Sequence, residues 1–307
     1  MPGPRVALAP EPADWAEQAV RDGGGQLVAL DASAEALVWT TPGGWEGLGD
    51  ALTAAPDVRW VQLPFAGVER VRETGVLTPD RTWSCAKGVY GEPVAEHALA
   101  LALAGLRGLP ERARARTWGE QGARTLYDAP VVVVGGGGIT AALVALLAPF
   151  RCRVVVVRRD GARAVPGAAR TVGSGELDAV LPDALVVFLT LALTEQTVHV
   201  IGAAQLALMR EDAWLVNVAR GAHVEPDGLV AALRSGSIGG AALDVTDPEP
   251  LPDDSPLWQL DRCLITPHTA NPWVTAQPLL AARVRDNVRR FAGGEPLEGT
   301  VDVAAGY

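Results

Sequence analysis

The chain has 307 residues, of which 49% are hydrophobic, and it carries a formal charge of −10 at neutral pH. This length exceeds the usual size of one domain, so two domains with sizeable cores are expected. The acidic balance argues against nucleic acid or an anionic membrane as a partner. No apolar run is long enough to cross a bilayer and no secretory leader is evident, so we expect a cytoplasmic protein.

Three cysteines, Cys85, Cys152 and Cys263, are odd in number and lie far apart in the sequence. This usage is typical of reduced thiols in a cytosolic protein and fits neither a disulfide framework nor a zinc site. We therefore expect no bound metal.

Residues 6–83 alternate short apolar runs with more polar, helix-like stretches. This β–α alternation predicts a parallel sheet, with an early helix over residues 15–21. Strands are expected at residues 6–9, 27–30, 37–39 and 60–63. A long helix over residues 92–106 then leaves this unit, and an Arg-, Gly- and Pro-rich arm or linker follows over residues 108–128.

A second alternating unit begins at Val131, and helices separate most of its strands, as a doubly wound parallel sheet requires. Its expected strands are residues 131–134, 154–157, 184–189, 214–218, 241–245 and 263–266. Its expected helices are residues 141–148, 203–209 and 226–233. A final helix is expected at about residues 276–291.

Four consecutive glycines follow the first strand of this second unit and precede a helix. Gly135 permits a tight turn, and Gly137 lets the backbone approach a pyrophosphate closely. The N–H groups at the helix start, at Gly138 and Ile139, favour an anion. This strand–turn–helix context predicts a dinucleotide site. Thr140 stands where the fingerprint has its third glycine, and we expect it to shift the helix slightly.

The end of the next strand decides which nucleotide is bound. An NAD site has a carboxylate there for the ribose hydroxyls, about 20 residues beyond the first glycine. Arg158 takes that position (158 − 135 = 23), and Arg159 follows. A guanidinium can bind a 2′-phosphate through two hydrogen bonds, whereas a carboxylate would repel it. NADP is therefore the preferred cofactor, and NAD stays open because the arginines could simply be solvated and Asp160 lies two residues on.

Three apolar, strand-like runs in the C-terminal half each lead to a polar residue: Arg220, Glu249 and His268. Open parallel sheets bind ligands beyond the carboxyl ends of their strands, so these residues are expected to lie together. An arginine can hold a carboxylate, a histidine can give a proton, and a glutamate can keep that histidine charged. These are the groups needed to reduce a keto acid. Asp247 competes with Glu249 for the carboxylate role.

These motifs, in this order and behind the dinucleotide fingerprint, resemble the D-isomer-specific 2-hydroxyacid dehydrogenase family over nearly the whole chain. The resemblance implies an α/β fold of two Rossmann-like domains with parallel, doubly wound sheets. The dinucleotide-binding domain, residues 103–276, is expected to be inserted into a discontinuous substrate domain, residues 1–102 and 277–307. A homodimer is also expected.

The resemblance further implies roles for the three residues. His268 would donate the proton, Glu249 would hold it in its charged form, and Arg220 would engage the substrate carboxylate and polarise the keto group. The remaining histidines have no matching motif and are expected to be structural: His97, His199 and His223.

Other contacts with the ligands follow from the same resemblance. Backbone N–H groups at Phe65, Ala66 and Gly67 would bind the substrate carboxylate. Asp244 would lie by the nicotinamide carboxamide, and the loop that contains Leu191 and Thr197 would run past the adenine. Besides the glycine turn and the two arginines, we expect the cofactor to contact Leu191, Thr197, Val218, Ala219, Arg220, Asp244, His268 and Ala270.

The predicted function is a reversible NAD(P)H-dependent reductase of small 2-keto acids, with His268 as acid and base. Glyoxylate or hydroxypyruvate is the preferred substrate, because residues 63–69 are similar to the corresponding loop of some such reductases. Phe65 and Trp273 are candidates to narrow the pocket, although either could simply belong to the core.

Two alternatives stay open: a non-catalytic dinucleotide sensor on the same fold, and a short-type phosphoglycerate dehydrogenase. The sensor is disfavoured because no recruitment segment is evident, and the long-type phosphoglycerate dehydrogenase because no regulatory domain follows Tyr307. Formate dehydrogenase is disfavoured because it uses a glutamine where this chain has Glu249. S-adenosylhomocysteine hydrolase is longer and is bound by different residues.

Overall fold

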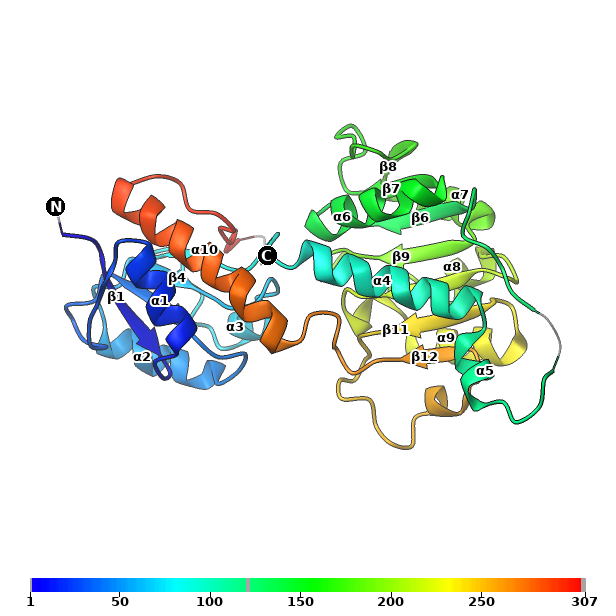
Figure 1. Ribbon diagram of the computed structural model, residues 1–307, viewed down its shortest axis with the longest axis horizontal. Coiled ribbons are helices and arrows are strands. Elements are labelled where there is room, and N and C mark those ends of the chain that lie inside the picture. The colour runs from blue at the N-terminus through cyan, green and yellow to red at the C-terminus, as the bar shows by residue number, and fades with distance from the viewer. Residues whose placement is uncertain (1, 120–121, 305–307) are drawn as a thin grey trace. The chain divides into compact units, whose positions relative to one another are not determined.

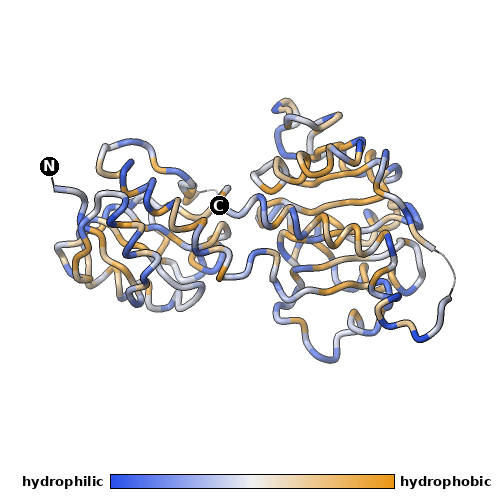
Figure 2. The backbone as a smooth tube through the Cα atoms, in the orientation of Figure 1, coloured by the Kyte–Doolittle hydropathy of each residue, from blue (hydrophilic) through white to orange (hydrophobic). Residues whose placement is uncertain are grey.

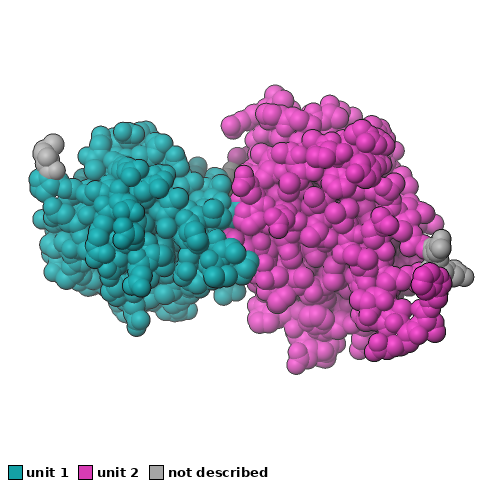
Figure 3. Space-filling model, viewed as in Figure 1, with its two compact units in different colours: residues 1–90, 272–307 teal, residues 91–271 magenta. Residues whose placement is uncertain are grey.

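A computed structural model describes residues 2–119 and 122–304 of the chain. It contains two compact units, coloured teal and magenta in Figure 3. Unit 1 comprises Met1–Tyr90 and Pro272–Tyr307, and unit 2 comprises Gly91–Asn271. The predicted α/β fold, with one unit inserted into another, is therefore confirmed.

The division between the units differs from the predicted domain boundaries at residues 102/103 and 276/277. Those boundaries fall inside two helices, α4 (Gly91–Leu106) and α10 (Trp273–Gly293). Each helix belongs as a whole to the unit in which it packs, α4 to unit 2 and α10 to unit 1. The assignment of substrate to unit 1 and dinucleotide to unit 2 stays a prediction.

Unit 1 contains a five-stranded parallel sheet with the order β2-β1-β3-β4-β5. Figure 1 labels two of its strands, β1 and β4. Its strands are β1 (Arg5–Ala9), β2 (Gln26–Leu27), β3 (Ala36–Trp39), β4 (Trp60–Gln62) and β5 (Thr82–Ser84). Its helices, besides α10, are α1 (Asp14–Asp22), α2 (Leu48–Ala54) and α3 (Glu69–Glu73). The sequence predicts all these strands except β5, in which Trp83 is the one apolar residue between Thr82 and Ser84. The prediction also places the end of β2 three residues too late, at residue 30 rather than at Leu27.

Side chains at successive positions of these strands face opposite sides of the sheet. Leu37 and Trp39 of β3 pack in one cluster with the buried residues of α2. Outside that cluster, Trp60 of β4 meets Phe291 of α10, with ring centroids 5.3 Å apart. Helices therefore cover both faces, as in a doubly wound sheet.

Unit 2 contains a seven-stranded parallel sheet with the order β12-β11-β10-β9-β6-β7-β8. Its strands are β6 (Pro130–Val134), β7 (Arg153–Arg158), β8 (Arg170–Gly173), β9 (Val186–Leu189), β10 (Trp214–Asn217), β11 (Gly240–Leu243) and β12 (Cys263–Ile265). Its helices, besides α4, are α5 (Leu109–Arg114), α6 (Gly138–Leu147), α7 (Leu177–Val180), α8 (Ala203–Leu208) and α9 (Pro226–Ser235). The strand order reverses at β6, and open α/β sheets bind ligands at such a switch point.

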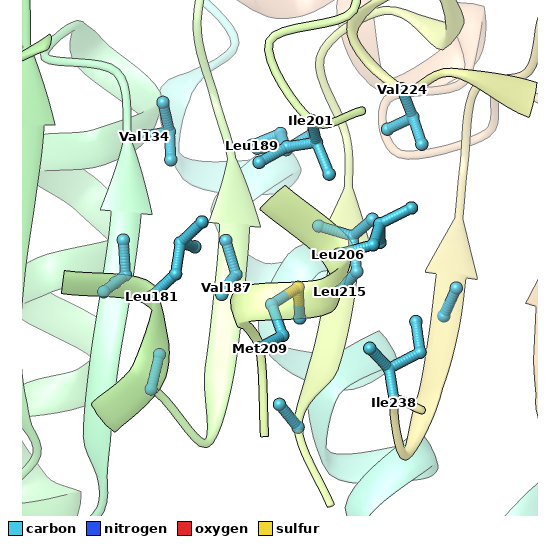
Figure 4. Close-up of a cluster of buried hydrophobic side chains, with 14 of the residues drawn as sticks. Val134, Leu181, Val187, Leu189, Ile201, Leu206, Met209, Leu215, Val224 and Ile238 are labelled. Atoms are coloured by element: carbon cyan, nitrogen blue, oxygen red, sulfur yellow. The ribbon is translucent and has the colours of Figure 1, made fainter. Parts of the chain in front are cut away.

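The core of unit 2 follows from its apolar strands, which Figure 2 colours orange. In one buried cluster, Val187 and Leu215 of neighbouring strands meet Leu206 of α8 (Figure 4). Helix α4 packs closely on β10, where a side chain at Gly105 would overlap the ring of Trp214. Because helices bury both faces of this parallel sheet, its strands are nearly continuous apolar runs in the sequence.

The sequence predicts six of the seven strands of unit 2 and misses β8 and α7, which have four residues each. The predicted arm, residues 108–128, contains the short helix α5, and its residues 120–121 lie outside the described residues. In the part of the chain that the structure describes, no helix is both long and apolar enough to cross a membrane.

Candidate active site

The strands of unit 2 are parallel, so their carboxyl ends lie along one edge of the sheet. The predicted groups follow successive strands at this edge: Gly135 after β6, Arg158 at the end of β7, Leu191 after β9, Arg220 after β10, Asp244 after β11 and His268 after β12. The structure thus brings the predicted residues of unit 2 to one edge. Phe65, Ala66 and Gly67 belong to unit 1.

The glycine turn joins β6 to α6. Gly135 has a φ of 132°, and a Cβ there would lie 2.6 Å from the Thr190 hydroxyl, so only glycine fits. Gly137 is the N-cap of α6, and a Cβ there would have no protein atom within 4 Å. Gly138 and Ile139 begin the helix, whose first N–H groups have no partner within it. The turn therefore presents these donors to an anion.

Thr140, which replaces the third glycine of the fingerprint, is buried and lies with its Oγ1 2.9 Å from the Oγ1 of Thr190. The Thr190 hydroxyl donates to the carbonyl of Val134, so Thr140 is the donor to Thr190. This pair fastens α6 to the ends of β9 and β6. A shift of the helix stays a prediction.

Arg158, the last residue of β7, lies against the glycine turn. A Cβ on Gly136 would be 2.8 Å from the Arg158 Nε, so the guanidinium packs directly over that glycine. Its Nη1 donates to the carbonyl of Arg163 at 3.2 Å. Arg159 is exposed beside it, and the Asp160 carboxylate accepts an N–H from its own loop. A guanidinium, and no carboxylate, therefore lies closest to the turn.

The turn that carries Arg220 is shaped by Asn217, a buried amide at the end of β10. Its Oδ1 accepts the N–H of Ala219 at 3.0 Å, and its Nδ2 donates to the carbonyl of Arg220 at 2.9 Å. Val218 and Ala219 are buried, and Arg220 is half-buried. The motif thus fixes the backbone from which the guanidinium extends.

Glycine at position 221 brings this turn to the segment that follows β11. A side chain on Gly221 would overlap the backbone of Thr246, so the two segments are in contact. Glu249 lies three residues beyond Thr246 (249 − 246 = 3), and its Oε1 is 2.7 Å from the Nδ1 of His268. The predicted contact is therefore present, and among the described residues Asp247 makes no such contact with His268.

The His268 side chain is 51% exposed and that of Glu249 is 35% exposed, so water screens their attraction. Because Nδ1 faces Glu249, Nε2 is the ring nitrogen left to face a substrate. His268 itself has a φ of 50°, a left-handed conformation that residues other than glycine seldom adopt.

The buried Asp244 carboxylate holds this turn in shape. It accepts the N–H of Thr269 at 2.9 Å and that of Ala270 at 3.0 Å, and the Asp244 carbonyl accepts the N–H of His268 at 2.8 Å. Burial raises the pKa of Asp244, but hydrogen bonds from His97, Thr266 and these backbone groups outweigh it and lower the pKa overall. Asp244 is therefore a charged carboxylate at neutral pH.

His97, expected to be structural, contacts the Asp244 carboxylate that shapes the His268 turn, a contact that sequence reasoning missed. From α4 its Nε2 lies 3.1 Å from the Oγ1 of Thr266 and 3.3 Å from the Oδ1 of Asp244. Thr266 in turn donates to the same carboxylate at 2.6 Å. No local motif marks this histidine, because the contact depends on how α4 packs against β11.

His223 was also expected to be structural, and it joins two parts of the site. It is fully buried, with Nδ1 2.9 Å from the carbonyl of Thr197 and Nε2 3.3 Å from that of Leu191. Leu191 and Thr197 belong to the loop that is expected to run past the adenine, and His223 follows the turn that carries Arg220. The imidazole of His223 therefore connects the adenine loop to the Arg220 turn.

In unit 1, residues 64–67 form a turn after β4. The Phe65 ring lies between two tryptophans, with centroids 6.3 Å from Trp45 and 6.2 Å from Trp273. Phe65 and Gly67 are half-buried, and Ala66 is exposed. An aromatic wall thus flanks this turn.

Comparisons with known proteins identify the family. A sequence model described as "D-isomer specific 2-hydroxyacid dehydrogenase, NAD binding domain" matches residues 98–270. A Corynebacterium melassecola relative, "Uncharacterized protein in proB 3'region", is 38% identical over 82% of this chain and 84% of that protein. Glyoxylate/hydroxypyruvate reductase A of Escherichia fergusonii is 40% identical over 142 residues, which are 46% of this chain and 45% of that protein.

Among solved structures, a D-isomer specific 2-hydroxyacid dehydrogenase from Xanthobacter autotrophicus Py2, in complex with NADPH and MES, matches with a TM-score of 0.85. It is 29% identical, and the match covers 100% of both chains. The family match itself extends over more than half of this chain. The chain therefore belongs to the D-isomer specific 2-hydroxyacid dehydrogenase family and is an NAD(P)-dependent oxidoreductase.

Proposed function

We propose that this protein is an NADPH-dependent reductase of small 2-keto acids, with glyoxylate or hydroxypyruvate as substrate. The observation that carries the proposal is the 2.7 Å contact between His268 and Glu249, on the same sheet edge as the glycine turn and Arg220. A proton donor, a carboxylate clamp and a dinucleotide turn at one edge are the parts that keto-acid reduction needs.

The chemistry divides between the cofactor and the chain. When bound, the reduced cofactor would supply the hydride that the keto carbon takes up. His268 delivers the proton from Nε2 to the keto oxygen, which leaves a 2-hydroxy acid and a neutral imidazole. The Oε1 of Glu249, 2.7 Å from Nδ1, orients the ring for this transfer. Arg220 holds the carboxylate and polarises the carbonyl, and a planar guanidinium suits both tasks. In the reverse direction the neutral His268 accepts the proton.

The residues of the glycine turn fit a dinucleotide. A side chain at position 135 would collide with Thr190, so the fold itself requires glycine there. A Cβ at position 137 would have no protein atom within 4 Å. A group outside the chain, such as a pyrophosphate against the first turn of α6, would explain glycine at position 137.

The preference for NADPH rests on Arg158. Its guanidinium packs over Gly136, where an NAD site would place a carboxylate for the ribose hydroxyls. Arg159 adds a second positive charge next to it. The Xanthobacter structure that covers this whole chain contains NADPH, which supports the same choice.

The substrate preference rests on two observations. The relative from Escherichia fergusonii is named as a glyoxylate/hydroxypyruvate reductase, over a match of 142 residues. The Phe65 ring, held between Trp45 and Trp273, would leave little room for a long side chain on the substrate. Assembly as a homodimer is part of this proposal and rests on the family resemblance.

A panel of 2-keto acids assayed with NADPH and with NADH tests the proposal. We expect the highest kcat/KM for glyoxylate or hydroxypyruvate with NADPH. Preference for a substrate with a long side chain would refute the substrate assignment. Tight NADPH binding without reduction of any 2-keto acid would instead identify a dinucleotide sensor.

A further inference from the structure

The turn at residues 64–67 is held by one short segment of unit 1, residues 85–90. The phenol of Tyr90 donates to the carbonyl of Pro64 at 2.6 Å. The N–H of Ala86 donates to the carbonyl of Phe65 at 2.9 Å, and the thiol of Cys85 donates to that of Ala66 at 3.5 Å. Three consecutive carbonyls of the turn are therefore directed to the same side.

The geometry of the peptide bond fixes where the N–H groups of the turn point. In a trans peptide the C=O of one residue and the N–H of the next are antiparallel. Because the three carbonyls face the 85–90 segment, the N–H groups of Phe65, Ala66 and Gly67 face away from it. Within the described residues, none of these three N–H groups donates a hydrogen bond to the protein. Successive N–H groups of this kind form a concave site for an anion.

The 85–90 segment is itself anchored. Arg283 of α10, whose side chain is 12% exposed, donates through Nη1 to the carbonyl of Cys85 at 3.2 Å and to that of Lys87 at 3.1 Å. The N–H of Cys85 donates to the carbonyl of Gly299 at 2.8 Å. The segment therefore provides a fixed support for the turn.

Tyr90 provides the shortest of the three contacts. Its hydroxyl lies in a buried region, and burial raises the pKa of Tyr90 well above its usual range, so the phenol remains a donor at every ordinary pH. The thiol of Cys85 is a weaker donor. Loss of the Tyr90 hydroxyl would leave the Pro64 carbonyl buried without a partner and free that peptide to rotate.

We propose that Tyr90 is a positioning residue that directs the N–H groups of Phe65, Ala66 and Gly67 toward the carboxylate of the substrate. The inference deepens the proposed function and rests on it, because it takes this turn as a binding group for the substrate carboxylate. Tyr90 acts through the backbone and does not itself touch the reacting atoms.

The test is Tyr90→Phe, which keeps the ring and removes the hydroxyl. We expect KM for the 2-keto acid to rise about five- to thirtyfold, as one buried hydrogen bond and an unsatisfied carbonyl would cause, with kcat changed much less. The dissociation constant of NADPH should stay unchanged. Faster amide hydrogen exchange is expected at Ala86, whose N–H donates to the carbonyl of Phe65 in the turn.

The matched control is Thr40→Val, which removes another buried hydroxyl of unit 1, one that donates to the carbonyls of Ala9 and Glu11. It should lower stability without raising KM. If Tyr90→Phe fails to fold, Cys85→Ala removes a neighbouring donor of the same turn and should raise KM about twofold. An unchanged KM and unchanged exchange in the folded variant would overturn the proposal.

Direct binding separates this inference from the proposed function. Oxamate, an unreactive carboxylate analogue of a small 2-keto acid, is titrated into the NADPH-bound protein. If wild type reduces no 2-keto acid, the proposed function fails, and weaker oxamate binding by Tyr90→Phe still supports the positioning role. Equal oxamate affinity in wild type and Tyr90→Phe rejects that role whatever the activity.

Discussion

Unit 2 presents charged side chains at the edge of its sheet, whereas unit 1 presents the backbone of one turn. In unit 2 the candidate groups are a guanidinium, a carboxylate and an imidazole, each at the end of a strand. In unit 1 the candidate donors are the N–H groups of residues 65–67, which three hydrogen bonds from the 85–90 segment orient. The two units thus offer different kinds of candidate ligand, side chains in unit 2 and backbone donors in unit 1.

The difference between side-chain and backbone groups determines what a single substitution can remove from each unit. A side chain of unit 2 can be removed by one substitution, which deletes its charge or its proton. An N–H group of unit 1 survives nearly every substitution, so it can be moved only through residues that orient the peptide, such as Tyr90. We therefore expect large losses from substitutions in unit 2 and smaller, KM-specific effects from unit 1.

The largest effect is expected for His268→Ala, which removes the proposed proton donor. General acid catalysis is typically worth about a hundred- to ten-thousandfold, so kcat should fall by that factor. The dissociation constant of NADPH should change little, because the glycine turn and Arg158 are intact. A variant that keeps more than a tenth of the wild-type kcat would show that His268 is not the donor.

Arg220→Lys is expected to have the next largest effect. It retains the positive charge and loses the planar fork, so one group can no longer hold the carboxylate and polarise the carbonyl together. We expect kcat/KM to fall about a hundredfold. Arg210→Lys is the matched control, since Arg210 makes a bidentate pair with Asp212 at the surface, and its kcat/KM should be unchanged. Equal losses in both variants would contradict a special role for Arg220.

The contrast between the units also explains how much of the molecule could be predicted from its sequence. Strand β6 is a run of buried valines and was readily predicted, whereas β5 and β8 have three and four residues with polar or glycine positions. The residues of unit 2 were predicted because each sits in a local motif at a strand end. The contact between Glu249 and His268 follows from two such motifs on adjacent strands.

Contacts that depend on packing between distant segments could not be predicted. His97 reaches Asp244 only because α4 packs against β11 within unit 2, and Tyr90 reaches Pro64 only because the chain returns beside the turn after β4. Neither residue belongs to a local pattern that indicates its partner. The backbone donors of residues 65–67 were inferred from the family resemblance alone, because N–H direction depends on backbone geometry rather than on residue type.

The preference between NADPH and NADH tests another side chain of unit 2, Arg158, for which we propose a single role in binding the cofactor. Arg158→Asp replaces the proposed ligand of the 2′-phosphate with a carboxylate, which would repel phosphate and accept hydrogen bonds from ribose hydroxyls. We expect NADPH affinity to fall about ten- to a hundredfold and NADH affinity to rise or stay level. Arg234→Asp makes the same charge change on α9 and should alter neither affinity. Wild type that binds NADH as tightly as NADPH would refute the NADPH assignment.

The smallest expected effect belongs to Glu249→Gln, which tests the partner of His268. Glutamine keeps a hydrogen-bonding group next to the Nδ1 of His268 but removes the negative charge of the carboxylate, which lies 2.7 Å away. The imidazole therefore loses a charged partner, so kcat should fall moderately while the dissociation constant of NADPH stays unchanged.

The size of that loss follows from exposure. Both side chains are more than a third open to water, which screens the pair and limits the expected fall in kcat to less than about tenfold. Asp247→Asn, which changes a neighbouring carboxylate without a contact to His268 among the described residues, should leave kcat unchanged. If Asp247→Asn lowers kcat and Glu249→Gln does not, the partner has been misassigned. Equal losses in both would mean that the net charge of the loop, rather than one contact, supports His268.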